Sequence, residues 1–385
     1  MKEYDLVCFS HLRWNFVFQR PQHLLTRFSK SCRVFYIEEP IFFDGNDYNK
    51  LTLVQENLWV VVPYLQQGST NDNVADRLEH LLKDLFVEKD VTKYIFWYYT
   101  PMFFEITNSF EPELVVYDCM DELSAFKFAP PKLKENENKL LKKADLVFTG
   151  GYSLYEFKKH LHNQIYPFPS SIDKDHFSKA RTNNSEPSDQ MSIPHPRIGF
   201  YGVIDERMNI GLIGTVALSR PDWHFVIIGP VAKIDKATLP KYANIHYLGN
   251  KSYQELPSYL AGWDIAIIPF ALNESTRFIS PTKTPEYLAA GKPVISSSIQ
   301  DVVNPYGQKG LVHIADTPDE FIAAAILEFG LADKQSWLSE VDLFLQNNSW
   351  DSTWNQMVLL INSKLKEKEY QKKINNLNLK ENVYV

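Results

Sequence analysis

Short apolar runs alternate with longer helical patterns along the first half of the chain. The runs are rich in β-branched and aromatic residues and predict strands at 5–11, 33–39, 94–99, 114–119 and 146–150. Near-continuous apolar strands separated by helices are typical of a parallel sheet that is covered on both faces. Two further runs, 51–54 and 58–62, are separated by three polar residues and predict a hairpin attached to this sheet.

The same alternation restarts in the second half of the chain. Residues 178–196 are polar and poor in apolar side chains, so we expect an exposed linker there and place the domain boundary within it. Beyond it, apolar runs predict strands at 197–203, 224–229, 245–248, 265–270 and 293–297. The pattern therefore predicts an α/β protein with two doubly wound, Rossmann-like units that face a cleft, where ligands of such sheets bind.

Length and charge narrow the classes of protein. A chain of 385 residues is too long for one ordinary core, so two domains are expected. The net charge of -7 argues against a dedicated nucleic-acid binder. Three cysteines, no signal-peptide pattern and no apolar run of membrane-spanning length favour a cytoplasmic protein with reduced thiols. Peripheral contact with the inner face of the cell membrane stays open.

Residues 280–296 carry the densest chemical signal. They follow a predicted strand and contain a helix start, a short helix closed by a glycine, and a new buried strand. Hydroxyls of Ser280 and Thr282, the charge of Lys283 and the free N–H groups of a helix start suit a diphosphate. Glu286 is placed to accept hydrogen bonds from ribose hydroxyls. The alternative is the capped start of a surface helix with a solvated Glu286.

This segment resembles the donor-binding helix of GT-B glycosyltransferases of the family-4, or group 1, type. The shared pattern is Pro-x-Lys-x-x-Glu-Tyr-x-Ala-x-Gly-x-Pro-Val, from Pro281 to Val294. The resemblance implies that Glu286 holds the donor ribose and that the helix start faces the diphosphate. The chain departs from the pattern at Phe278, where many of these families have a second Glu, and Glu274 has the wrong spacing to replace it.

The beginning of the second domain resembles the same family. The predicted strand ends at Gly202, which permits close backbone approach, and a basic residue follows at Arg207. The resemblance implies that Arg207 contacts the donor phosphates, as guanidinium geometry favours. Gly229 follows the next strand and fits a turn near the nucleotide. The alternative for these positions is a set of tight turns with a solvated arginine.

The first predicted strand is followed by a loop that is unusually rich in arginine, tryptophan, glutamine and histidine. Such a loop is costly to bury, and we expect it to face the cleft. It resembles the opening of bacterial glycosyltransferases of cell-surface polysaccharide synthesis, including teichuronic-acid-type enzymes. Its candidate catalytic residue is His11, and its candidate acceptor-binding residues are Arg13, Trp14, Gln19, Arg20 and His23.

Closely spaced carboxylates follow another predicted strand. Asp118 and Asp121 are candidates for a base or for orienting an acceptor hydroxyl, because neighbouring carboxylates can have pKa values that are pushed apart. The alternative is an N-cap with acidic first-turn residues. Asp173 and Asp175 lie where the family has a turn, and no Cys/His set has zinc spacing. We expect no bound metal and no cofactor.

The resemblance implies a metal-independent glycosyltransferase of the hexosyltransferase type. A nucleoside-diphosphate sugar would be the co-substrate, and a glycan or lipid-linked molecule the acceptor. It also implies a helix at 348–370 that crosses back to the first domain. Composition predicts domains at 1–180 and 197–347, a linker at 181–196, and a polar, frayed tail at 371–385. The alternatives are a sugar-nucleotide epimerase with the same fold and a non-catalytic nucleotide-binding protein. Neither domain begins with the Gly-x-Gly-x-x-Gly turn that a dehydrogenase would favour.

Overall fold

The computed structural model describes residues 2–68, 74–183 and 185–381. In its first half, the described strands form one nine-stranded sheet in the order β3-β5-β2-β1-β6-β7-β8-β9, with β4 beside β5. Every pairing is parallel except that of β4 with β5, which is the predicted hairpin. The strands are β1 (Asp5–Ser10), β2 (Val34–Glu38), β3 (Ile41–Phe43), β4 (Tyr48–Gln55), β5 (Leu58–Gln66), β6 (Tyr94–Tyr98), β7 (Leu114–Cys119), β8 (Leu146–Thr149) and β9 (Ile165–Pro167).

The second half has its own parallel sheet, whose described strands follow the order β12-β11-β10-β13-β14-β15. This order reverses direction at β10, and such switch points are where open α/β sheets bind ligands. All five strands predicted for this half are present, and β15 is additional. The strands are β10 (Arg197–Tyr201), β11 (His224–Ile228), β12 (Ile245–Gly249), β13 (Ile265–Ile268), β14 (Val294–Ser296) and β15 (His313–Ile314).

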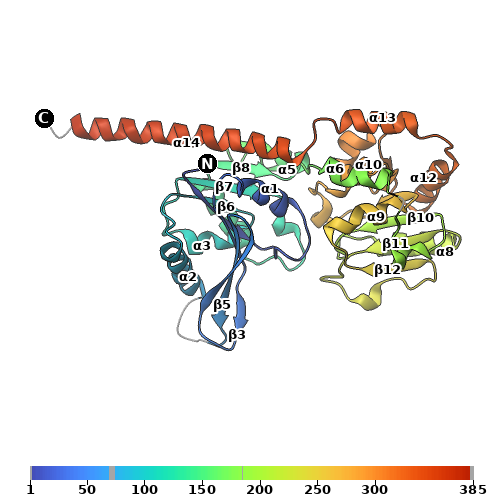
Figure 1. Cartoon of the computed structure of the whole chain (residues 1–385), viewed down its shortest axis with the longest axis horizontal. Helices are drawn as coiled ribbons and strands as arrows, with labels where there is room; N and C mark the ends of the chain where they lie inside the picture. The colour runs from blue at the N-terminus through green and yellow to red at the C-terminus, as the bar shows by residue number, and fades with distance from the viewer. Residues whose placement is uncertain (1, 69–73, 184, 382–385) are drawn as a thin grey trace.

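Helices connect the strands of both sheets, as the alternation predicts. Those of the first half are α1 (Arg20–Phe28), α2 (Val74–Glu88), α3 (Phe104–Thr107), α4 (Leu133–Lys143) and α5 (Tyr152–Lys158). Those between and beyond are α6 (Lys174–Phe177), α7 (Ser188–Met191), α8 (Ile210–Ser219), α9 (Leu256–Ala261), α10 (Lys283–Ala289), α11 (Gln300–Val302), α12 (Pro318–Gly330), α13 (Gln335–Phe344) and α14 (Trp350–Glu381). Figure 1 shows the two halves side by side, with α14 running from the second back along the first.

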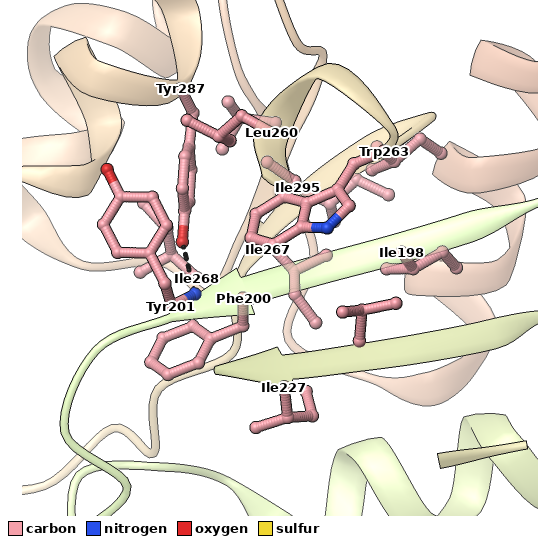
Figure 2. Close-up of a cluster of buried hydrophobic side chains, with 14 of the residues drawn as sticks. Ile198, Phe200, Tyr201, Ile227, Leu260, Trp263, Ile267, Ile268, Tyr287 and Ile295 are labelled. Carbon is pink, nitrogen blue, oxygen red and sulfur yellow. Dashed lines mark hydrogen bonds between the residues drawn. The ribbon is translucent and has the colours of Figure 1, made fainter. Parts of the chain in front are cut away.

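The core of the second half fixes the position of β10. Figure 2 shows aliphatic and aromatic side chains from β10, β11, β13 and β14 packed around Trp263. Gly199 lies against this indole, and a Cβ at that position would come 1.9 Å from the ring. The hydroxyl of Tyr287 in α10 accepts a hydrogen bond of 3.1 Å from the backbone N–H of Tyr201. Packing and this bond together fix α10 against the carboxyl end of β10.

Two expectations about the connecting segments are wrong. The polar stretch at 178–196 is not a simple exposed linker, because Gln190 is fully buried and accepts a hydrogen bond of 2.8 Å from the indole of Trp263. Arg197 ion-pairs with Glu186 of the same stretch. The tail at 371–385 is not frayed over its described part, since α14 continues to Glu381. Lysine, glutamine, leucine and glutamate have good helix propensity, so this polar segment continues the helix without apolar periodicity, and residues 371–375 are exposed.

Helix α14 closes the chain onto the first half, as the resemblance implied. Trp350, Met357, Ile361 and Leu365 are buried in the hydrophobic cluster beneath β1 and β6. These positions recur with helical spacing, so one stripe of α14 faces the first sheet. Arg27 of α1 makes two hydrogen bonds to Asp351, at 2.9 and 3.1 Å. The chain thus passes between the halves twice, once before β10 and again at the start of α14.

Candidate active site

A cleft of about 190 Å³ lies between the two halves, at the carboxyl ends of their strands. Both sheets contribute to its walls. The first half supplies residues from the loop before α1 and the loop after β7. The second half supplies residues that follow β10, β11, β12 and β13, and the start of α10. The predicted site residues on these walls are Gln19, Arg20, Asp121, Gly202, Arg207, Gly229, Ser280, Thr282, Lys283 and Glu286.

Two glycines form tight turns after β10 and β11. Gly202 and Gly229 have φ angles of 139° and 137°, which L side chains rarely adopt. A Cβ on Gly229 would come 1.9 Å from the carbonyl oxygen of Gly202, and a Cβ on Gly202 would come 2.4 Å from Cε of Lys283. The two turns and the lysine therefore pack without room for a side chain, and backbone forms this part of the cleft floor.

Glu286 is a buried carboxylate in the cleft wall, with 5% of its surface exposed. The hydroxyl of Tyr201, at the end of β10, donates a hydrogen bond to its Oε2. Burial raises the pKa of Glu286, while the Tyr201 bond and the charge of Lys283 oppose that rise. One carboxylate oxygen is thus held by protein, and the group is oriented to accept hydrogen bonds from a ligand.

The start of α10 brings the other predicted donor-site residues to the cleft. Thr282 precedes the helix and Lys283 is its first residue. Burial and the neighbouring Arg207 lower the pKa of Lys283. Ser280 lines the cleft too, but its carbonyl oxygen accepts a hydrogen bond of 2.6 Å from Ser170 Oγ. Ser280 therefore also joins the two halves.

Arg207 lies on the cleft wall in an ion pair with its neighbour Asp205. Three hydrogen bonds of 2.7 to 3.1 Å join its guanidinium to that carboxylate. The guanidinium carbon lies 5.6 Å from the ring of Phe126, which belongs to the loop after β7. Asp205 and Phe126 together fix the orientation of the guanidinium. The orientation of its remaining N–H donors is therefore fixed as well.

Asp118 and Asp121 occupy different environments. Asp118 is fully buried beneath the cleft, where Arg20 makes hydrogen bonds of 2.8 to 3.1 Å to both of its oxygens. Asp121 lines the cleft, and burial raises its pKa to about 6, with Arg207 and Arg20 opposing the rise. The geometry brings Asp121, and not Asp118, to the cleft wall. Asp118 with Arg20 instead anchors the strand end.

Arg20 has a second partner that explains its burial. Its Nη1 donates a hydrogen bond of 2.7 Å to the carbonyl oxygen of Phe168, just after β9. The guanidinium therefore links β7 to the segment that leads into the second half. Gln19 lines the cleft beside it and forms a reciprocal cap with Gln22 at the start of α1.

The remaining residues predicted from the first loop lie away from the cleft wall. Arg13 pairs with Glu38 at 2.9 Å, and Trp14 packs edge-on against Tyr36 at 5.0 Å. His23 is buried and stacks on Trp350 at 4.6 Å. Burial lowers the pKa of His11 to about 4, and its buried Nδ1 has no hydrogen-bond partner within the described residues. The structure therefore does not bring these four side chains together with the donor-site residues.

Several residues of the cleft were not foreseen from the sequence. Tyr201 positions Glu286, Phe126 lies under Arg207, and Tyr253 lines the wall after β12. The ring of Tyr253 is stacked between Phe18 of the first half, at 4.4 Å, and His176, at 4.3 Å. Aromatic residues at strand ends are a weak signal, because buried packing is their commoner role.

The fold and the site define a class of protein. Two parallel α/β sheets face each other across a cleft, and one wall combines bare strand ends, a helix start, two cations and a buried carboxylate. This arrangement suits a nucleotide whose phosphates meet backbone N–H groups and cations and whose ribose meets a carboxylate. It is the architecture of a GT-B nucleotide-sugar enzyme.

Comparison with known proteins bears this out. Residues 195–329 match the family described as glycosyl transferases group 1. The chain is 25% identical over 285 residues to TuaH of Bacillus subtilis (strain 168), a protein assigned to teichuronic acid biosynthesis as a glycosyltransferase; the match covers 68% of this chain and 70% of TuaH. Residues 195–329 therefore resemble a group 1 glycosyltransferase domain, and about two thirds of the chain is similar to a glycosyltransferase.

Solved structures with the same fold cover nearly the whole chain. Sucrose-phosphate synthase from Thermosynechococcus elongatus is similar with a TM-score of 0.67 at 14% identity, over 94% of this chain and 98% of that one. The catalytic domain of starch synthase IV from Arabidopsis thaliana, bound to ADP and acarbose, has a TM-score of 0.62 at 11% identity, over 94% and 99%. The GT-B fold predicted from the sequence is confirmed.

Two further observations concern metals and membranes. Within the described residues, no three His, Cys, Asp or Glu side chains are grouped so that they could hold a metal ion. Metal independence stays a prediction. In the same part of the chain, no helix has the length and apolar character needed to cross a membrane.

Proposed function

We propose that the chain transfers a hexosyl group from a nucleoside-diphosphate sugar to an acceptor hydroxyl during assembly of a cell-surface polysaccharide. The observation that carries the proposal is that Glu286, Lys283 and Arg207 share one wall of a cleft whose other wall holds Asp121. Donor-type and acceptor-type groups thus face each other across the space where transfer would occur. The assignment of TuaH to teichuronic acid biosynthesis supports the polysaccharide role.

The donor would lie on the wall formed by the second half. The diphosphate would lie against the backbone of Gly202 and Gly229, which line the cleft, and Glu286 would accept hydrogen bonds from the ribose hydroxyls. Negative charge develops on the leaving diphosphate as the glycosidic bond breaks. Lys283, Arg207 and the N–H groups at the start of α10 would stabilise that charge, so we propose that no metal ion is needed.

The acceptor would approach from the first half. The carboxylate of Asp121, with a pKa of about 6, is mostly ionised at pH 7 and would accept a hydrogen bond from the incoming hydroxyl. We propose that this acceptor is a glycan or a lipid-linked molecule, met at the inner face of the cell membrane. Closure of the cleft would exclude water that competes with the acceptor.

The test is a panel of nucleotide sugars screened by thermal shift, since a ligand that binds only the folded state raises the midpoint of unfolding. Donors that bind are then incubated alone and with glycan acceptors, and the released nucleoside diphosphate is measured, with and without a metal chelator. We expect acceptor-dependent release that resists chelation. Interconversion of the sugar nucleotide without an acceptor would instead identify an epimerase, and binding without any release would identify a non-catalytic protein.

A further inference from the structure

The loop that follows Asp121 leads into an unusually basic stretch of an acidic chain. Residues 127–143 contain six lysines and two glutamates, whereas the whole chain has a net charge of -7. One of the two acids, Glu137, is buried in an ion pair with Lys158 at 2.8 Å. Outward charge in this stretch is therefore almost entirely positive.

Phe128 lies at the tip of this loop and is 76% exposed, the largest fraction among the exposed aromatic side chains of the described residues. Its φ angle is 68°, a left-handed conformation that is strained for any residue with a bulky side chain. Burial cannot explain why this conformation is retained, because the ring has little protein around it. The strained backbone holds an apolar ring out into solvent.

One lysine lies beside the exposed ring, and two more exposed lysines follow in the same loop. The Nζ of Lys127 lies 5.2 Å from the ring centre of Phe128. Lys132 has 66% of its side chain exposed, and Lys134 is exposed as well. Leu133 between them is buried and begins α4, which anchors the loop to the first sheet. The loop thus carries one apolar ring and three exposed lysines, of which Lys132 also lies 3.5 Å from the carboxylate of Glu105.

The same loop reaches the active-site cleft at its other end. The ring of Phe126 has the guanidinium of Arg207 at 5.6 Å and the Nζ of Lys233 at 5.5 Å, both from the second half. One residue, Lys127, separates Phe126, which contacts Arg207 of the cleft wall, from Phe128 at the exposed tip. A surface that bound Phe128 would therefore lie at the mouth of the cleft.

We infer that this loop, residues 126–134, docks the protein on an anionic lipid bilayer, with Phe128 inserted at the headgroup level and Lys127, Lys132 and Lys134 against the headgroups. Aromatic rings favour the membrane interface, and basic side chains bind anionic lipid surfaces. One apolar anchor and a basic cluster are the two signals that stable peripheral binding requires. The inference rests on the proposed transfer at the membrane face, since docking would present a lipid-linked acceptor to the cleft.

The experiment measures sedimentation of the full chain with vesicles of phosphatidylcholine alone and of phosphatidylcholine with phosphatidylglycerol. We expect binding to the anionic vesicles that falls as salt rises, because the attraction is screened beyond about 10 Å at 0.1 M salt. Phe128→Asn should weaken partitioning about tenfold, since it removes the ring while asparagine tolerates the left-handed backbone. The triple change K127Q/K132Q/K134Q should weaken it about a hundredfold, at roughly fivefold per lysine.

Matched controls lie on the second half. Leu343 is 73% exposed, and Leu343→Ala removes a comparable apolar side chain from α13. The triple change K236Q/K241Q/K309Q removes three exposed lysines with the same change in net charge. We expect both controls to bind vesicles like the unchanged protein.

Three results would overturn the inference. The first is equal binding to neutral and anionic vesicles. The second is an equal loss of vesicle binding in the control variants and the loop variants. The third is an affinity of the loop for a soluble polyanion such as heparin that matches its affinity for vesicles. Failure of docking is distinguishable from failure of the proposed function, because nucleotide release with a soluble acceptor does not require a membrane. The loop variants should keep that release and their midpoint of unfolding.

Discussion

Replacing Glu286 with glutamine tests the donor site directly. The carboxylate is buried, and Tyr201 holds one of its oxygens. If both ribose hydroxyls donate to it, two charge-assisted hydrogen bonds are weakened at once, each worth about 1.5 to 3 kcal/mol. Glutamine has the same shape and keeps part of this hydrogen-bond energy. We therefore expect the free energy of donor binding to weaken by about 2 to 4 kcal/mol, which raises the dissociation constant of the donor roughly 30- to 1,000-fold.

The pH dependence makes the prediction more specific. Burial raises the pKa of Glu286, so the ionised fraction falls as pH is lowered through that raised value. Donor affinity of the unchanged protein should fall with it, and the affinity of Glu286→Gln should lose this dependence. A carboxyl group whose pKa is higher in the folded than in the unfolded state makes folding less favourable as pH rises between the two values. The glutamine variant should therefore be at least as stable as the unchanged protein at pH 8.

The assay is calorimetric titration of the nucleotide sugar between about pH 5.5 and pH 8.5, with unfolding followed in parallel. Tyr201→Phe is the matched control, because it removes the hydroxyl that orients Glu286 and leaves the carboxylate in place. We expect about a tenfold loss from Tyr201→Phe, the value of one hydrogen bond. Equal donor affinity in Glu286→Gln and the unchanged protein, at every pH, would refute the ribose assignment.

Three further predictions follow from the geometry. Asp121→Asn should lower turnover while donor affinity stays unchanged, and unchanged turnover would exclude its acceptor role. The variant should also raise the free energy of unfolding by about 3 kcal/mol at pH 8 but hardly at pH 4, because burial raises the pKa of Asp121 to about 6. Gly229→Ala should lower the free energy of unfolding by about 3 kcal/mol or more, because its Cβ would come 1.9 Å from the carbonyl oxygen of Gly202. Gly310→Ala is the control: its φ is also positive, at 69°, but it has open space around it, so chemical denaturation should show a loss of only about 1 kcal/mol. Asp301→Ala should remove the two hydrogen bonds of 2.9 Å that the N–H groups of Tyr152 and Ser153 donate to its carboxylate. We expect the angle between the halves to change, which small-angle X-ray scattering would detect. A scattering curve identical to that of the unchanged protein would show that this contact does not set the angle.

The sequence predicts the strands well where burial dictates composition. β1, β7 and β11 are flanked by other strands and covered on both faces, so nearly every position is apolar and the run is easy to find. β3 and β15 were not predicted. They have three and two residues and incompletely buried side chains, and strands this short owe their conformation to the neighbour they pair with.

The sequence could group the candidate donor-site residues because they are close together in the chain. Ser280, Thr282, Lys283 and Glu286 lie within seven positions, and a helix start places them on one wall. Their supporting contacts were not predictable, since Tyr201 reaches Glu286 across 85 residues. For the same reason Asp118 was proposed as catalytic, although Arg20, 98 residues away, occupies its carboxylate. A lone sequence does not reveal which of two nearby acids is already paired.

The position where many group 1 families have a second glutamate has a different role in this chain. Phe278 stacks on Phe157 of α5 with ring centres 4.5 Å apart, and among the described residues it is not part of the cleft wall. Asp301, from the same half, accepts hydrogen bonds from the start of α5. Both side chains thus hold the second half against one helix of the first. Because Phe278 contributes packing between the halves and no polar group toward the cleft, selection among sugars would depend on other residues of the cleft. Asp121 of the first half and Arg207 of the second are two charged candidates, and the charge of the arginine opposes the rise in the pKa of that carboxyl.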